Sequence, residues 1–139
     1  MSTAYQIAIL AAGVFFLNGL LTGVWKYKQI ESSPDAVAHP YVDIAHRSSL
    51  LYAFAAILIA NFVQISQLTA MVENAATIAL LVYFAVSISI YMVQGYLGET
   101  DNQLRQIKPS TKLFMWSLIV AEIGGFLVLF YGVLTAFFG

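Results

Sequence analysis

The chain has 139 residues, of which 60% are hydrophobic and 9% are charged, and its formal net charge is −1. Soluble domains average about 45–50% apolar and about 25% charged residues, so this composition excludes an ordinary soluble domain and indicates a membrane protein. The sequence has no excess of basic residues, and we therefore expect no nucleic-acid partner.

Four apolar runs are long enough to cross a bilayer, which takes about 20 residues of helix. They cover residues 5–25, 44–65, 75–97 and 113–138. The first run lacks the basic start and the cleavage site of a signal peptide, so we expect it to be retained as a helix. The sequence thus predicts an all-α fold, an integral membrane four-helix bundle in which residues 1–139 form a single membrane domain.

The basic residues indicate how this bundle is oriented. All six lysines and arginines lie in or beside the first and third connections, residues 26–43 and 98–112. Loops on the cytoplasmic side of membrane proteins are enriched in these residues. We therefore predict a multi-pass protein of the cytoplasmic (inner) membrane, with both charged connections inside and both termini outside.

Residues 39–46 combine helix-start signals with possible metal ligands. Pro40 and Asp43 suit the first turn of a helix, which we expect to begin near His39. On a continuous helix, His39, Asp43 and His46 would lie within about 60° of one another, and two histidines with one carboxylate can bind non-haem iron. A residue before proline is disfavoured in helical geometry, however. We therefore favour capping roles for His39 and Asp43, with a mononuclear metal site as the alternative.

His46 is the stronger candidate ligand, because the chain has only two histidines and no cysteine. Ser49, Ala53 and Ala56 follow it on the same helical face and leave the helix thin enough for a flat macrocycle to approach. One interpretation is an axial haem ligand, with the other face of the iron open. The other is an imidazole at the headgroup boundary that bonds water or a neighbouring helix.

Further polar residues lie within the apolar runs. The third run has a polar stripe within about 80° of its circumference, formed by Tyr83, Ser87, Tyr91 and Gln94. The first run has a shorter stripe formed by Asn18, Thr22 and Trp25. Polar groups at membrane depth must face protein or a cavity, so each stripe either lines a site or bonds a neighbouring helix.

Glu122 lies well inside the fourth run. We expect its carboxyl group to be neutral and to donate a hydrogen bond to Asn18 or Gln64, although a proton-coupled carrier would also place an acid there. Small residues favour close helix packing in membranes, and those of this chain predict a homo-oligomer. The candidate faces are Gly19/Gly23, Ala53/Ala56/Ala60 and Ala121/Gly125/Gly132.

Three segments and one dipeptide together resemble a known family. They are residues 15–23 (FFLNGLLTG), 45–52 (AHRSSLLY) and 90–94 (IYMVQ), followed by the pair Asn102-Gln103. Over most of the chain the sequence resembles styrene oxide isomerase and its small four-helix membrane relatives. Tyr91 follows His46 by 45 residues, which matches the family's interval between its haem ligand and its catalytic tyrosine.

This resemblance implies a homotrimer in which each chain binds one haem b through His46 as iron ligand. We expect Ser49, Tyr83 and Ser87 to contact the cofactor, and Tyr91 and Tyr52 to be catalytic. The implied reaction is the Meinwald rearrangement of a small apolar, aromatic epoxide to a carbonyl compound, with ferric iron as a Lewis acid and no net redox change.

Two residues depart from the family pattern. Tyr52 stands where the isomerases have an asparagine, and Tyr83 stands where they have an aspartate. Haem binding is therefore better supported than styrene oxide as the substrate.

Other classes of protein remain as alternatives. Membrane glutathione transferases share the size, but this chain lacks their asparagine and glutamate on the second helix. A haem sensor or redox protein would also fit the candidate ligand, and a non-catalytic carrier or assembly subunit would use Glu122 and the polar stripes.

Overall fold

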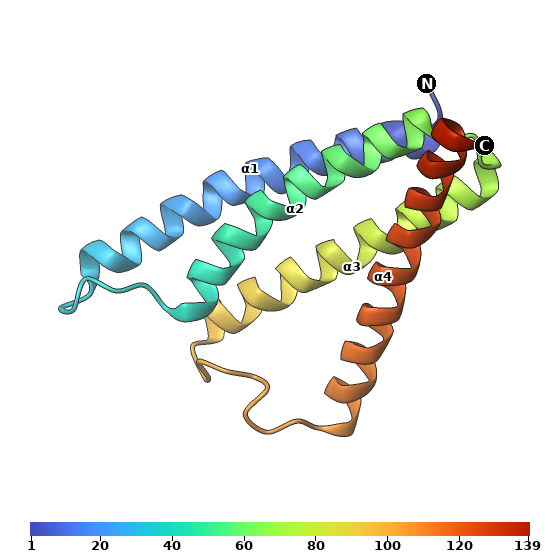
Figure 1. Cartoon of the computed structure of the whole chain (residues 1–139). Coiled ribbons are helices and arrows are strands. Elements are labelled where there is room, and N and C mark those ends of the chain that lie inside the picture. The colour runs from blue at the N-terminus through green and yellow to red at the C-terminus, as the bar shows by residue number, and fades with distance from the viewer.

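The computed structural model describes residues 1–139 and contains four helices and no strand (Figure 1). They are α1 (Thr3–Ser32), α2 (Pro40–Ile65), α3 (Ala70–Leu97) and α4 (Pro109–Phe138). Each helix is long and apolar enough to cross a membrane. The predicted all-α four-helix fold is therefore confirmed.

The helices extend beyond the predicted apolar runs. α1 begins where the Ser2 hydroxyl accepts a hydrogen bond from the Tyr5 amide at 3.2 Å, and it ends at Ser32 rather than at residue 25. Neither glycine nor proline interrupts residues 26–33, so the backbone stays helical through this polar stretch. The apolar runs therefore predict the segments that can cross the membrane, whereas the capping residues determine where the helices begin and end.

The start of α2 confirms the interpretation of residues 39–43. His39 is the N-cap, and its Nδ1 accepts a hydrogen bond from the Tyr41 amide at 3.2 Å. Pro40 occupies the first helical position, and Asp43 lies in the first turn. A lone pair of the His39 ring thus satisfies an amide that the helix leaves free.

Small residues bring the helices of one chain close together. α1 packs along α2, and α3 packs against both. The alanines of α2 at positions 53, 56 and 60 are buried in this core. A methyl group at Gly125 would lie 3.1 Å from Leu80, and one at Gly132 would clash with the Ser66 hydroxyl. The predicted oligomer faces are therefore largely covered within the chain, because its helices use them for their own packing.

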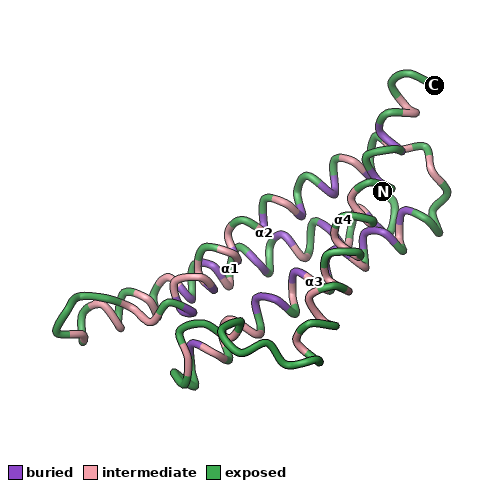
Figure 2. The backbone as a smooth tube through the Cα atoms, turned by 60° about the horizontal axis from the view of Figure 1, so that its bottom comes forward, coloured by how far each residue is buried: buried purple, intermediate pink, exposed green.

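α4 stands apart from the other helices over much of its length. It contacts α2 and α3 but not α1 (Figure 1). Its only buried residues are Leu129, Gly132 and Val133, near the C-terminus, and the tube in Figure 2 is mostly exposed or intermediate along this helix. α3 and α4 therefore diverge towards the 98–108 connection.

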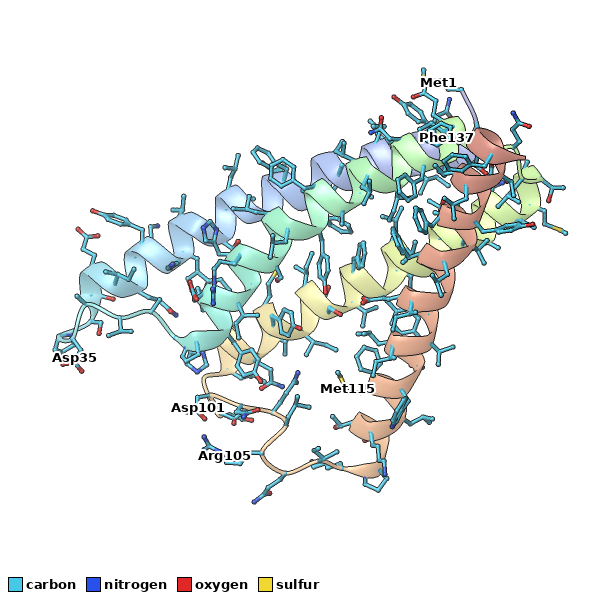
Figure 3. All side chains as sticks on the ribbon, viewed as in Figure 1. Met1, Asp35, Asp101, Arg105, Met115 and Phe137 are labelled. Atoms are coloured by element: carbon cyan, nitrogen blue, oxygen red, sulfur yellow. The ribbon has the colours of Figure 1, made fainter.

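The ends of the chain and the charged connections lie at opposite ends of the bundle. Figure 3 places Met1 and Phe137 at one end, and Asp35, Asp101 and Arg105 at the other. This arrangement follows from four antiparallel crossings, and it agrees with a multi-pass protein whose termini share one side.

Candidate functional site

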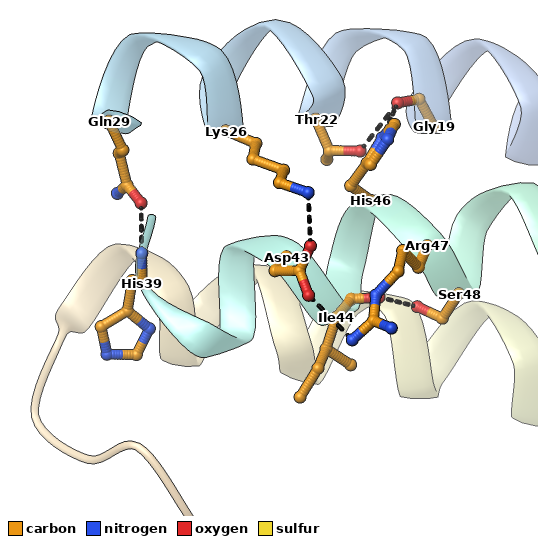
Figure 4. A network of polar contacts seen from close by, with 10 residues as sticks. All are labelled: Gly19, Thr22, Lys26, Gln29, His39, Asp43, Ile44, His46, Arg47 and Ser48. Atoms are coloured by element: carbon orange, nitrogen blue, oxygen red, sulfur yellow. Dashed lines mark hydrogen bonds and ion pairs between the residues drawn. The ribbon is translucent and has the colours of Figure 1, made fainter. Parts of the chain in front are cut away.

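His46 lies in the second turn of α2, and its ring is directed towards α1 (Figure 4). Its Nδ1 is 2.7 Å from the backbone oxygen of Gly19. A carbonyl oxygen can only accept, so Nδ1 carries the proton and donates to it. The neutral ring then has its lone pair on Nε2, which makes no hydrogen bond within the chain.

Gly23 provides the space for this ring. A methyl group at Gly23 would lie 2.9 Å from Cε1 of His46 and 3.1 Å from its Nδ1, so the ring would have to move. At Gly19 an added methyl group would meet the Leu50 side chain at 2.6 Å. The two glycines therefore let α2 approach the backbone of α1 closely enough for the bond from His46.

In the polar stripe of α1, Asn18 bonds α2, whereas Thr22 bonds carbonyls of its own helix. The Asn18 amide donates to the Ser49 hydroxyl at 2.9 Å, and Ser49 donates to the Ala45 carbonyl at 2.6 Å. The Thr22 hydroxyl lies 2.7 Å from the Asn18 carbonyl and 3.1 Å from that of Gly19. Ser49, predicted to contact a cofactor, is fully buried in this network.

Charged residues hold α1 and α2 together at the end where the charged connections lie. Asp43 pairs with Lys26 of α1 at 2.6 Å and with Arg47 one turn along α2 at 2.8 Å (Figure 4). The backbone amide of His39 donates to the Gln29 side chain at 2.9 Å. His39, Asp43 and His46 do not gather into a metal-binding group, since no three His, Asp or Glu side chains of the chain do so.

A second group of polar residues lies between α2 and α3, away from His46. It consists of Tyr52 of α2 and of Ser87 and Tyr91 of α3. They line a small cavity of about 90 Å³ that α4 closes with Phe114 and Met115. The Ser87 hydroxyl is buried there without a hydrogen-bond partner. Figure 3 shows Met115 on the side of α4 that faces α3. The predicted cofactor contact Tyr83 is close by and packs against Phe114, with 6.0 Å between ring centroids.

Tyr41 and Gln103 belong to this second site although neither was predicted as a site residue. The Tyr41 ring stacks on Tyr91 with 6.1 Å between centroids. Its hydroxyl accepts a hydrogen bond from the backbone amide of Gln103 at 2.7 Å, and this bond ties the 98–108 connection to the start of α2. Periodicity gives no signal for a contact between a helix start and a distant loop, although the Asn102-Gln103 dipeptide did mark this loop.

The structure separates His46 from the tyrosines within one chain. At about 100° per residue, Tyr52 lies about 120° around α2 from His46. His46 contacts α1, whereas Tyr52 stacks on Phe84 of α3 at 4.2 Å and lines a cavity with α4. The cavities lined by Tyr52 and by Glu122 do not include His46.

Glu122 does not pair with either predicted partner. The Asn18 amide is bonded to Ser49, Gln64 is exposed, and Oε1 of Glu122 is buried without a hydrogen-bond partner. The expected Asn18 contact is wrong because α4 does not reach α1. Glu122 instead lines an apolar cavity of about 310 Å³ between α2, α3 and α4.

Comparisons with known protein families, with curated protein sequences and with solved structures found no match to this chain. The resemblance to styrene oxide isomerases therefore stays a prediction from the sequence.

Proposed function

We propose that this chain is a membrane haem protein in which Nε2 of His46 binds the iron of haem b. The observation that carries the proposal is the 2.7 Å hydrogen bond from His46 Nδ1 to the Gly19 carbonyl. Histidine ligands of metals usually donate their second ring N–H to a carbonyl or carboxylate, which fixes the tautomer and the ring orientation. His46 meets this requirement before any metal binds.

The chain's own residues limit where the haem would lie. Neither the cavity beside Tyr52 nor the cavity beside Glu122 includes His46, so a haem on Nε2 would lie outside both cavities. Lipid or another copy would then cover its remaining surface. We propose the homotrimer that the sequence resemblance implies, with the α3–α4 side of one copy facing the α1–α2 side of another.

We further propose that the protein is an epoxide isomerase acting on a small apolar, aromatic epoxide. Bound ferric haem would supply a Lewis acid for the epoxide oxygen. The aromatic rings of Tyr52 and Tyr91 suit a benzylic carbon that gains positive charge as the C–O bond opens. Apolar helix faces would exclude the water that otherwise gives a diol. A multi-pass protein of the inner membrane, with cytoplasmic charged connections, would receive such substrates from the bilayer.

Absorption of the purified protein tests haem binding. After expression with a haem precursor, we expect a Soret band at about 400 nm from histidine-ligated haem. His46→Ala should abolish the band, whereas His39→Ala should keep it, because His39 serves as a helix cap. A colourless wild type, or loss of colour only in His39→Ala, would contradict the proposal.

Product analysis tests the reaction separately. The ferric protein given aryl epoxides should yield the aldehyde without added reductant, and His46→Ala should lose this activity. Coloured but inert protein would favour a haem sensor or redox protein.

The second candidate is a non-catalytic membrane carrier. It is favoured by Glu122, whose buried carboxyl oxygen has no partner and borders a cavity.

A further inference from the structure

The cavity beside Glu122 has the features of a ligand site separate from His46. Its volume of about 310 Å³ lies at the lower end of the range for small-molecule sites, roughly 300–1,000 Å³. Eight of its nine lining residues are hydrophobic, and the ninth is Glu122. A single polar group in an apolar cavity fixes which kind of ligand the cavity can accept.

The carboxyl group of Glu122 has neither a hydrogen-bond donor nor a basic residue as partner within the chain. Its Oε1 is buried and makes no hydrogen bond. The six lysines and arginines all lie in or beside the two charged connections, and no basic residue lines the cavity. A buried carboxyl oxygen without a donor or a cation is costly, so a ligand that supplies one would be stabilised there.

Aromatic rings form a fixed wall of the same cavity. Phe84 is held by the parallel ring of Tyr52, with 4.2 Å between centroids. The ring centroid of Phe126 lies 5.7 Å from that of Phe62 and 5.8 Å from that of Phe130. Phenylalanine faces attract organic cations, and carboxylates pair with them.

We propose that this cavity binds a small hydrophobic organic cation, such as an aromatic ammonium compound. Glu122 releases its proton to water when the cation enters and then serves as its counter-ion. The cation would supply the positive charge that the chain does not place near Glu122, and its apolar part would fill the space between Phe84, Phe126 and Leu80. This site does not depend on haem at His46.

Direct binding of radiolabelled benzyltrimethylammonium to the detergent-purified full chain tests the proposal, with empty micelles as background. We expect saturable binding that Glu122→Gln weakens by roughly tenfold to a hundredfold, as expected for loss of a contact to a charged group. Glu73→Gln is the control, because Glu73 is a buried acid in the first turn of α3 that does not line the cavity. His46→Ala should bind as the wild type does, whatever its haem content.

Two further measurements separate this site from an apolar cavity that lipid fills. Neopentylbenzene has carbon in place of the quaternary nitrogen, and it should compete at least about tenfold more weakly than the unlabelled cation. Ala55→Phe places a ring in the cavity without removing the carboxyl group, and it should also abolish binding, with circular dichroism verifying the helices. Absence of saturable binding, equal competition by neopentylbenzene, or unchanged affinity in Glu122→Gln would each overturn the proposal.

Discussion

At the scale of single residues, Gly23 decides whether the His46 ring can lie against α1. A methyl group there would be 2.9 Å from Cε1, so Gly23→Ala should push the ring away from the Gly19 carbonyl. Both alanine variants gain helix propensity, so the lost hydrogen bond should make Gly23→Ala about 0.5–1.5 kcal/mol less stable to unfolding than Gly13→Ala, and it should weaken haem binding. Detergent-denaturant titration followed by circular dichroism measures the first effect, and haem titration of the apoprotein measures the second.

Gly13→Ala is the matched control on the same helix. A methyl group at Gly13 meets nothing within 4 Å. Alanine favours the helix over glycine by up to about 1 kcal/mol, so this variant should be as stable as the wild type or more stable. If both alanine variants behaved alike, the close fit of His46 against Gly23 would not matter.

At the scale of helices, Asp43 joins α2 to α1 by pairing with Lys26, and it also pairs with Arg47 within α2. The pairs are partly exposed, with 27% of the Asp43 side chain accessible, so each should contribute about 0.2–1 kcal/mol. Asp43→Asn should lower the free energy of unfolding by that order at low salt. The loss should shrink in high salt, because ions screen the wild-type pairs.

Asp101→Asn controls for the mere loss of a negative charge. Asp101 pairs with Arg105 inside a single connection, and both side chains are more than half exposed. This variant should leave stability unchanged at either salt concentration. An Asp43→Asn variant that behaved the same way would show that the pairing between α1 and α2 is not energetically important.

The same helices show how far sequence reasoning reached. The start of α2 was predictable because the residue before a proline avoids helical geometry, and because Pro40 and Asp43 suit the first turn of a helix. The site at His46 was predictable only in part, because its partner is a backbone carbonyl and a carbonyl has no sequence signature. The divergence of α4 was not predictable, since this helix is apolar on almost every side and its pattern favours no packing direction.

At the scale of the whole molecule, two polar regions lie on different sides of one thin bundle. His46 bonds α1, whereas Tyr52, Ser87 and Tyr91 face α4. The His46-to-Tyr91 interval suggested one site, because a linear interval cannot say which side of a helix each residue faces. If His46 and the tyrosines act on one substrate, two copies must supply them.

The orientation of the bundle in the membrane is testable because the chain has no cysteine of its own. Single cysteines can replace Gln67, exposed between α2 and α3, and Asp35 or Glu99, exposed in the charged connections. The positive-inside rule predicts that Gln67→Cys reacts with an impermeant maleimide in intact cells. Asp35→Cys and Glu99→Cys should react only after permeabilisation. The opposite labelling would reverse the orientation, whereas labelling of Asp35→Cys and Gln67→Cys from the same side would contradict the four crossings.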